Sequence, residues 1–373
     1  MSRLPPRFQS LQGSLRPTRA EVSLEAIAHN YREVRRVVGV PVLAVVKADA
    51  YGHGVVSVAR RLAREGAASF GVALAEEGLE LRAAGIRRPI LVLNGVYGGA
   101  YQDVLDAELT PVVYDLDTVA AFAAVDPAFA FHLKIDTGMS RLGVSHRALP
   151  MFLAGLERFP RVIIRGVMTH LAAADTDPEF TALQLDRFDG AVDAIRRRGH
   201  EPTTVHAANS AGALLSPRAR YDMVRPGIAL YGAAPFSHGL TLRPTLRLRT
   251  EIIRVAEIEP GDSVGYDRTF VAKAPCRIAT LPIGYGDGLL FRSEQARVAL
   301  VKGVRCPIVG RVSMDLSAVD ITAVSATVGD EVVLLGRQGN AEIQAEELAA
   351  GSGTIPYEVL TSVSRRVPRA YST

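Results

Sequence analysis

Apolar runs alternate with helical patterns through the first two thirds of the chain, and this alternation restricts the fold more than any other feature. The apolar runs typical of buried strands cover residues 42–46, 69–74, 90–94, 111–115, 130–136, 162–170, 203–208 and 221–227. Both faces of these strands are apolar, as a buried parallel sheet requires. Eight strand–helix units in about 230 residues predict an α/β fold with an N-terminal (β/α)8 TIM-type barrel.

The segments outside this alternation set the remaining organisation. Residues 1–18 are basic and interrupted by proline, so we expect an N-terminal extension without the apolar core of a signal peptide. We assign residues 19–240 to the barrel. From residue 241 to 373 the pattern changes to period two with Gly and Pro punctuation, which predicts a C-terminal, mostly antiparallel β-domain. A short helical pattern interrupts it at 345–351.

Composition argues against several classes of protein. The formal net charge of +4 over 373 residues is too small and dispersed to indicate a nucleic-acid partner. Cys276 and Cys306 have neither metal-ligand spacing nor the number of a disulfide framework, so we expect reduced thiols and no metal. No stretch approaches the roughly 18 apolar residues of a membrane helix. We therefore expect a cytoplasmic protein without a membrane partner.

Lysine is rare in this chain. Of the 43 Lys and Arg residues, the lysines are Lys47, Lys134, Lys273 and Lys302. A guanidinium keeps its proton near neutral pH, whereas a lysine can lose it and do amine chemistry. Lys47 ends the apolar run "AVV", where a charged residue is unexpected, and it therefore indicates chemistry.

Further polar residues stand at the predicted strand ends. In a (β/α)8 barrel the active site lies at the C-terminal ends of the strands. Lys47 ends the first strand, "KIDTGMSRLG" ends the fifth and His170 ends the sixth. Asn209 and Ser210, in "NSAGA", follow the seventh strand, and the eighth carries Arg225 in "RPG". These placements predict one common active site.

A neutral lysine at this position can form a Schiff base with a carbonyl substrate or with pyridoxal phosphate. For the cofactor, the Ser210 hydroxyl and the backbone N–H groups of "NSAGA" and "PGI" can bind a phosphate. Arg225 can face the pyridine nitrogen. From the residues alone, an aldolase-type lysine and a pyridoxal phosphate lysine both stay open.

Longer motifs carry a resemblance to a known family. They are "AVVKADAYGHG", "KIDTGMSRLG", "HAANSAGAL", "VRPGIALYG", "VGYDRTF", "LPIGYGDG", "GRVSMD" and "IPYE…SRRVPRAY". In this order, from about residue 17 to 371, they resemble the alanine racemase family. The resemblance implies an isomerase that uses pyridoxal 5'-phosphate, with a barrel and a C-terminal β-domain. It also implies a supply of D-alanine for peptidoglycan.

The resemblance assigns roles to the barrel residues. It implies that Lys47 binds pyridoxal phosphate covalently. The residues implied to hold the cofactor are Tyr51, Arg141, His170, Asn209, Ser210, Arg225, Gly227, Ile228 and Tyr357. Arg225 is implied to contact the pyridine nitrogen, with His170 beside it.

Racemisation requires a proton acceptor on each face of the α-carbon, and the resemblance implies Lys47 and Tyr266. Because Tyr266 lies in the β-domain, the implied assembly is a head-to-tail homodimer with shared active sites. The substrate residues implied by the resemblance are Arg141, Tyr285, Met314 and Asp315. Lys134 matches a lysine that is carbamylated in many members.

The resemblance also concerns the substrate entrance, and the sequence departs from the family pattern at two positions. Asp175 and Arg311 are implied to lie at the substrate entrance. Phe291, followed by Arg292, replaces an arginine usual after "GYGDG", so the entrance departs there from the family pattern. Residue 19 is Arg where tryptophan is common.

Alternatives remain at this stage. One is a racemase of the same family with broader specificity, such as for serine. Another is a pyridoxal phosphate-binding protein without racemase activity, but such proteins lack the β-domain and its tyrosine. A barrel-type decarboxylase must release the carboxylate that Arg141 and Met314 are implied to retain.

Overall fold

A computed structural model describes residues 15–237, 239–289 and 298–373. The chain divides into two compact units. The barrel unit is Ala26–Arg243, and the β-unit joins the residues up to Glu25 to Pro244–Thr373. Within the described ranges, no helix is long and apolar enough to cross a membrane.

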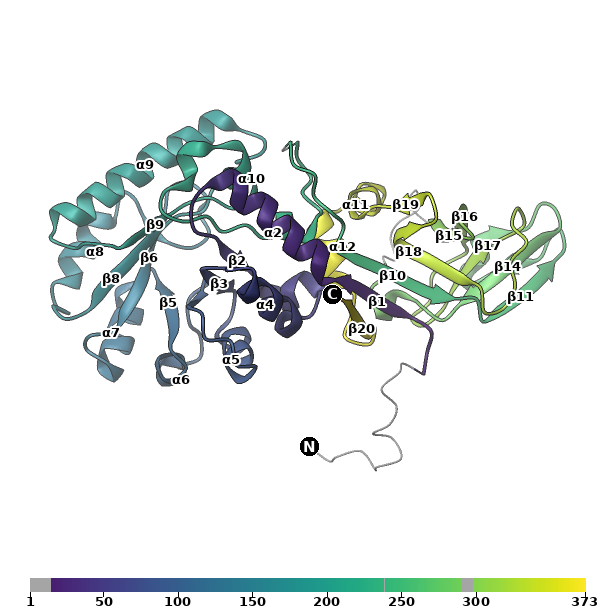
Figure 1. Cartoon of the computed structure of the whole chain (residues 1–373), viewed down its shortest axis with the longest axis horizontal. Helices are drawn as coiled ribbons and strands as arrows, with labels where there is room; N and C mark the ends of the chain where they lie inside the picture. The colour runs from purple at the N-terminus through teal and green to yellow at the C-terminus, as the bar shows by residue number, and fades with distance from the viewer. Residues whose placement is uncertain (1–14, 238, 290–297) are drawn as a thin grey trace, which may run out of the picture. The chain divides into compact units, whose positions relative to one another are not determined.

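A parallel sheet forms the centre of the barrel unit, in the order β2-β3-β4-β5-β6-β8-β9 (Figure 1). Its strands are β2 (Leu43–Val45), β3 (Ser69–Val72), β4 (Ile90–Val92), β5 (Leu109–Val113), β6 (Ala130–Asp136), β8 (Ile163–Met168) and β9 (Thr204–His206). The short β7 (Val144–Ser145) pairs with β6. Their residues are mostly buried, as expected for strands covered on both faces.

Residues 222–226 close the barrel, although they form no regular strand. On one side, the N–H groups of Asp222 and Arg225 donate to the carbonyls of Val205 and Ala208, at 3.0 and 2.9 Å. On the other side, Leu43 N donates to Val224 O at 2.9 Å, and Val42 and Val224 form a parallel bridge. The predicted eighth strand is thus an extended segment that joins β9 to β2.

Helices lie around the parallel strands (Figure 1). They are α2 (Leu24–Val38), α4 (Val55–Arg64), α5 (Ala75–Ala83), α6 (Tyr101–Asp106), α7 (Leu116–Val125), α8 (Leu149–Leu156), α9 (Pro178–Arg197) and α10 (Ser210–Leu215), with the 3-10 turns η1 (Pro217–Arg220) and η2 (Ile228–Tyr231). The long α9 begins where sequence rules predict, because Asp177 accepts a hydrogen bond from Phe180 N and proline follows at the first position.

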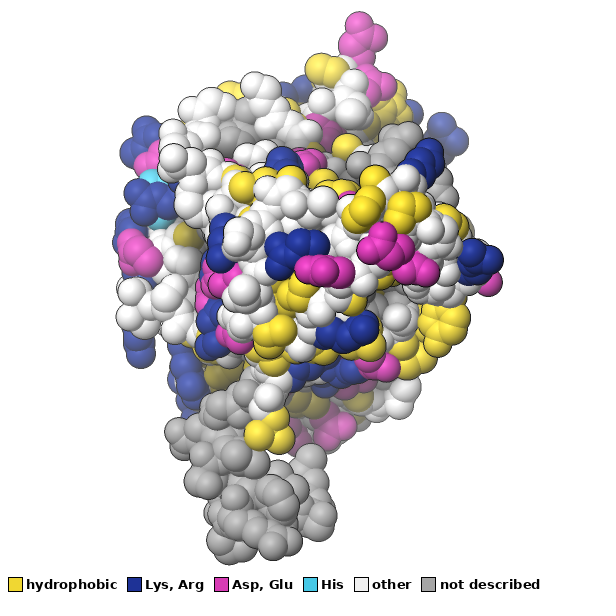
Figure 2. Space-filling view, turned by 90° about the vertical axis from the view of Figure 1, so that its right-hand side faces the viewer, with side chains coloured by type: hydrophobic (Ala, Val, Ile, Leu, Met, Phe, Trp, Pro, Cys, Tyr) yellow, Lys and Arg dark blue, Asp and Glu magenta, His cyan; other side chains and the backbone are white. Residues whose placement is uncertain are grey.

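The β-unit contains a mixed, mostly antiparallel sheet in the order β11-β14-β17-β16-β15-β18-β10-β1-β20, with β19 paired to β18. The strands are β1 (Arg19–Ser23), β10 (Leu246–Glu251), β11 (Arg254–Ile258), β14 (Cys276–Leu281), β15 (Val298–Val301), β16 (Val304–Val309), β17 (Ser317–Asp320), β18 (Glu331–Gln338), β19 (Ala341–Ile343) and β20 (Arg369–Ser372). The strands β12 (Ser263–Val264) and β13 (Phe270–Val271) pair separately. Figure 2 shows charges of both signs interspersed with hydrophobic side chains on one face of this unit.

The position of β1 differs from the sequence assignment of residues 19–240 to the barrel. β1 pairs with β10 and β20, not with a barrel strand. Its burial alternates, with Ala20 and Val22 fully buried, which suits a sheet with one buried face. On the other face, Glu21 forms ion pairs with Arg247 and Arg249.

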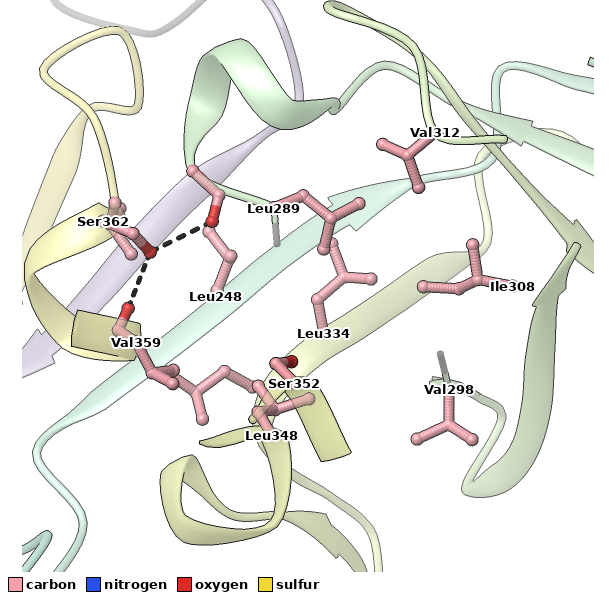
Figure 3. A pocket seen from close by; sticks show the side chains of 13 residues that line it. Leu248, Leu289, Val298, Ile308, Val312, Leu334, Leu348, Ser352, Val359 and Ser362 are labelled. Carbon is pink, nitrogen blue, oxygen red and sulfur yellow. Dashed lines mark hydrogen bonds between the residues drawn. The ribbon is translucent and has the colours of Figure 1, made fainter. Parts of the chain in front are cut away.

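Two helices accompany the sheet of the β-unit. The predicted helix at 345–351 is α11 (Ala345–Ser352). A second helix, α12 (Pro356–Ser362), was not predicted, although proline at its first position is a known start signal. Leu248, Leu334, Leu348 and Val359 line an apolar pocket beside these helices (Figure 3). None of its lining residues is a predicted site residue, so it does not mark the candidate site.

A substitution at Gly166 tests the packing inside the barrel. A Cβ at this position would overlap the ring of His132 on the neighbouring strand, and that ring is buried. Overpacking a core costs about 1–3 kcal/mol. We therefore expect Gly166→Ala to lower the free energy of unfolding by about that amount, measured by urea unfolding with circular dichroism.

Gly190 provides the matched control. It lies in α9, and a Cβ there would contact nothing within 4 Å. Because alanine favours a helix over glycine, Gly190→Ala should gain about 0.5–1 kcal/mol. Equal stability of the two variants would contradict the predicted overlap at Gly166.

Candidate functional site

Arg225 is the buried centre of the candidate site, with 4% of its surface exposed. Its Nη1 donates to His206 Nδ1 at 2.8 Å. Its Nη2 donates to the carbonyls of Thr169 and Ala207 at 2.7 and 2.9 Å, and lies 3.4 Å from His170 Nδ1. Burial lowers the pKa of Arg225 to about 9, so the guanidinium still carries its charge at neutral pH. Neutral acceptors thus fix its orientation.

Two buried histidines extend this network. His206 Nε2 and His132 Nδ1 lie 2.8 Å apart. Since Arg225 donates to Nδ1 of His206, the His206 proton is assigned to Nε2, which donates to His132. Burial, followed by the charges of Arg165 and Arg225, lowers the pKa of His132 to about 3. Burial, followed by Arg225 and His132, also holds the pKa of His206 well below its usual value, so both rings are neutral.

Lysines and arginines from several strand ends influence one another here. Burial lowers the pKa of Lys47, and the charge of Arg141 lowers it further. Burial also lowers the pKa of Lys134 to about 8, with added effects of Arg225, Arg141 and Lys47. His170 has a lowered pKa for the same reasons. The structure therefore brings these sequence-predicted residues together in a cationic cluster, which favours an anion and neutral amines.

The predicted phosphate-binding residues also lie together in the barrel unit. Ser210 Oγ accepts hydrogen bonds from Gly227 N at 2.9 Å and Ala229 N at 3.3 Å. A Cβ at Gly227 would overlap the Tyr51 hydroxyl, so glycine is required for this close approach. The other two predicted residues are placed by backbone and burial: Asn209 caps α10 through Gly212 N, and the Ile228 side chain is buried.

Lys47 begins a strained turn. Ala48, Asp49, Ala50 and Tyr51 all have φ between 52° and 53°, in the left-handed region. Each such non-glycine residue costs about 1–2 kcal/mol. Surrounding contacts hold the turn: the Tyr51 ring stacks on that of Tyr231 at 4.6 Å, and Asp49 Oδ1 accepts from Val55 N at 2.7 Å. Strain of this kind gathers at functional sites.

The remaining predicted residues belong to the β-unit, and their positions are given within that unit alone. Tyr266, Met314 and Tyr285 are exposed by 68, 52 and 43%. Tyr285 N donates to Ser313 O at 3.0 Å, which joins the Tyr285 loop to the Met314 loop. The others are placed as follows: Asp315 pairs with Arg366, Arg311 pairs with Asp267, and Tyr357 lies on α12.

A buried carboxylate holds these loops of the β-unit. Asp287 is completely buried and receives two hydrogen bonds from Arg16, at 2.9 and 2.8 Å. Arg366 lies 3.4 Å from the same carboxylate and also pairs with Asp315. These contacts fix the "GYGDG" turn beside the "GRVSMD" turn.

Four positions named from the sequence remain. Asp175 is exposed in the loop after β8, and Arg19 lies on β1. Phe291 lies outside the described residues, as does Arg292.

Sequence reasoning missed His132, His206 and Glu77. The two histidines lie inside the apolar runs "AFHLKID" and "TTVHAA", where a buried histidine is usually structural. The first run did contain a signal for His132. It lies two residues before Lys134, so both side chains lie on the same face of the strand. Glu77 lies on α5 and had no motif to mark it; its contacts with the Lys47 turn appear only in the structure.

The neutral histidines predict acid sensitivity of the barrel unit. The folded pKa of His132 is about 3, below the unfolded value near 6.5, so the unfolded state binds more protons between these values. Stability is therefore complete above pH 6.5 and is lost as the pH falls towards 3. For His132 this loss should be about 2 kcal/mol between pH 7 and 5, measured by urea unfolding at both pH values.

His132→Asn is the control for this pH dependence. The Asn Oδ1 can replace Nδ1 as the acceptor from His206, but it cannot be protonated in this range. We expect its loss of stability between pH 7 and 5 to be smaller than that of the wild type by about 2 kcal/mol. Identical losses would show that His132 is not held neutral in the folded state.

Comparisons with known proteins agree over both units. Residues 22–235 match the model of the alanine racemase N-terminal domain, and residues 245–371 match that of the alanine racemase C-terminal domain. The alanine racemase of Sorangium cellulosum is 45% identical, covering 96% of this chain and 99% of its own. The alanine racemase of Geobacter sulfurreducens is 43% identical, covering 95 and 97%.

Solved structures give the same result. Alanine racemase from Bacillus anthracis, with bound L-Ala-P, has a TM-score of 0.92 at 36% identity, covering 97% of this chain and 96% of its own. The biosynthetic alanine racemase from Pseudomonas aeruginosa has a TM-score of 0.86 at 37% identity, covering 96 and 100%. Because the domain models and these relatives span almost the whole sequence, this chain belongs to the alanine racemase family.

Proposed function

We propose that this chain is an alanine racemase that interconverts L-alanine and D-alanine with pyridoxal 5'-phosphate, and so supplies D-alanine for the cell wall. The observation that carries the proposal is the Lys47 amine just after β2, within the cationic cluster of Lys134, Arg141 and Arg225. The names of its relatives support the same activity.

The residues of the barrel unit fit this cofactor. Burial and the charge of Arg141 lower the pKa of Lys47, which favours the neutral form of the amine that a Schiff base needs. Tyr51, Ser210 and Gly227 lie together, and the missing Cβ at Gly227 leaves room beside the Tyr51 hydroxyl. Arg225 would face the pyridine nitrogen, and we propose that Tyr357, from the β-unit, adds a phosphate contact. When bound, the cofactor withdraws electrons from the substrate α-carbon and so acidifies its proton.

Two groups then move the α-proton on opposite faces. Lys47 Nζ would accept or return it on one face, as a neutral amine or an ammonium. Tyr266 would do the same on the other through its phenol oxygen. We propose that Tyr266 contacts His170, which would connect the phenol to the Arg225 charge, since His170 Nδ1 lies 3.4 Å from Arg225 Nη2.

We propose that a second copy of the chain supplies Tyr266, in a head-to-tail homodimer. Tyr266, Tyr285, Met314 and Leu316 are large hydrophobic residues exposed on the β-unit, with 42–68% of their surfaces accessible. Exposed apolar groups of this kind mark interaction sites. Met314 and Asp315 would bind the substrate from the partner, while Tyr285, Arg311 and Asp175 would border its entrance.

Arg141 would bind the substrate carboxylate. Asp136 fixes its loop, because Oδ1 of Asp136 accepts hydrogen bonds from the N–H groups of Gly138, Met139 and Ser140. Lys134 is placed near enough for its charge to influence neighbouring cations. A carbamate on Lys134 would change this repulsion to attraction and hold Arg141.

Isotope exchange tests the proposed reaction. L-Alanine incubated with the reconstituted protein in heavy water should give α-deuterium in both enantiomers, measured by mass spectrometry after chiral separation. Loss of carbon dioxide would instead indicate a decarboxylase, and no exchange would indicate a binding protein. Repeating the assay with L-serine tests broader specificity.

Tyr266→Phe provides the matched variant of this assay. Because it removes the proton acceptor from one face, we expect racemisation to fall by about 10²–10⁴-fold. Exchange on the Lys47 face, starting from one enantiomer, should survive better than racemisation. Wild-type rates in both directions would contradict the two-acceptor assignment.

Carbamylation of Lys134 has its own test. The pKa of about 8 leaves about a tenth of the amine neutral at pH 7, far more than for an ordinary lysine, and only the neutral amine reacts with carbon dioxide. Protein incubated with ¹³C-bicarbonate should give a carbamate carbon signal by NMR. Lys134→Ala should lose this signal, and a signal that remains in that variant would place the carbamate elsewhere.

A further inference from the structure

The carboxylate of Glu77 joins two neighbouring strand ends of the barrel unit. Glu77 lies in the first turn of α5, which follows β3. Its Oε2 accepts hydrogen bonds from Ala73 N at 2.7 Å and Leu74 N at 3.2 Å, which caps α5. Its Oε1 accepts from Ala48 N at 2.6 Å. Ala48 is the residue directly after Lys47, so one side chain contacts both loops.

Ala48 is also the first residue of the left-handed turn. Later amides of the turn bond locally, since Ala50 N donates to Val46 O and Gly54 N donates to Asp49 O, both at 2.9 Å. The Ala48 amide instead donates to Glu77, a side chain from another element. A left-handed run of non-glycine residues persists only where surrounding contacts enforce it. Glu77 thus fixes the entry of the turn, as Asp49 fixes its exit through Val55 N.

Glu77 also opposes the positive charge around Lys47. Burial and then the charge of Arg141 lower the pKa of Lys47, and the Glu77 carboxylate opposes this shift. The charge of Lys47 in turn lowers the pKa values of Lys134 and His170. Of the two charges that act on Lys47 here, Glu77 carries the negative one, and its position is fixed by three backbone hydrogen bonds.

We propose that Glu77 is a positioning residue for Lys47: it anchors the strained turn at Ala48 and keeps a negative charge beside the amine. This inference rests on the proposed function of Lys47 as the cofactor lysine. Glu77 acts through the turn and through its charge, without contact with the reacting atoms. It sets both the direction of the amine and the pH at which the amine becomes neutral.

Three variants separate this role from simple capping of α5. Glu77→Gln keeps the shape and an acceptor oxygen but removes the charge. Glu77→Asp keeps the charge but shortens the side chain by one methylene, so the carboxylate lies farther from Ala48 N. Glu76→Gln is the matched control, because Glu76 is exposed in the same turn of α5.

The measurement is the titration of the Lys47 amine in protein freed of cofactor. Formaldehyde with cyanoborohydride methylates neutral amines, and peptide mass spectrometry gives the extent at Lys47 for each pH, with Lys273 as internal reference. We expect Glu77→Gln to lower the titration midpoint of Lys47 by about half a pH unit or more. Glu76→Gln should match the wild type.

The outcomes decide between the two roles. A folded Glu77→Gln protein with the wild-type midpoint and a lower unfolding temperature would overturn the proposal, because Glu77 would then only cap α5. If Glu77→Gln does not fold, Glu77→Asp should shift the midpoint in the same direction by a smaller amount, and an unshifted midpoint in that variant would overturn the proposal too. Since no substrate or cofactor is present, absence of racemase activity in the wild type would contradict the proposed function without affecting this result.

Discussion

Closure of the barrel by residues 222–226 is the constraint on which the candidate site depends. The hydrogen bonds of this segment to β9 and β2 fix Arg225 between its two neighbours. Gly227 follows two residues later and approaches Tyr51, while Lys47 follows β2 on the other side of the closure. One set of backbone contacts thereby sets the positions of the guanidinium, the phosphate-binding residues and the amine.

The second feature of the site is the positive charge of Arg225 beside this closure. Arg225 is held by neutral histidines and carbonyls, and its charge acts on Lys134 and His170. A buried cation whose hydrogen-bond partners are neutral favours binding of an anionic ligand and favours the neutral form of nearby amines. The same property that makes the site receptive to a phosphate and a carboxylate therefore prepares Lys47 for amine chemistry.

Much of this could be predicted from the sequence. Apolar periodicity gave the parallel strands, and a rare lysine at a strand end indicated the site, because both signals are local. The pairing of β1 with β10 could not be predicted, since it joins residues more than 200 positions apart. The His132–His206 contact and the left-handed turn were missed for a related reason. A buried histidine has the same local pattern whether it is structural or part of a network, and alanines and tyrosine carry no sign of a positive φ.

The central claim is that the Lys47 amine is the covalent attachment point of the cofactor. Borohydride reduction of the protein reconstituted with pyridoxal 5'-phosphate, followed by peptide mass spectrometry, tests it directly. The account predicts a stable pyridoxyl group on Lys47. A group on Lys134, Lys273 or Lys302 instead, or no labelled lysine at all, would contradict it.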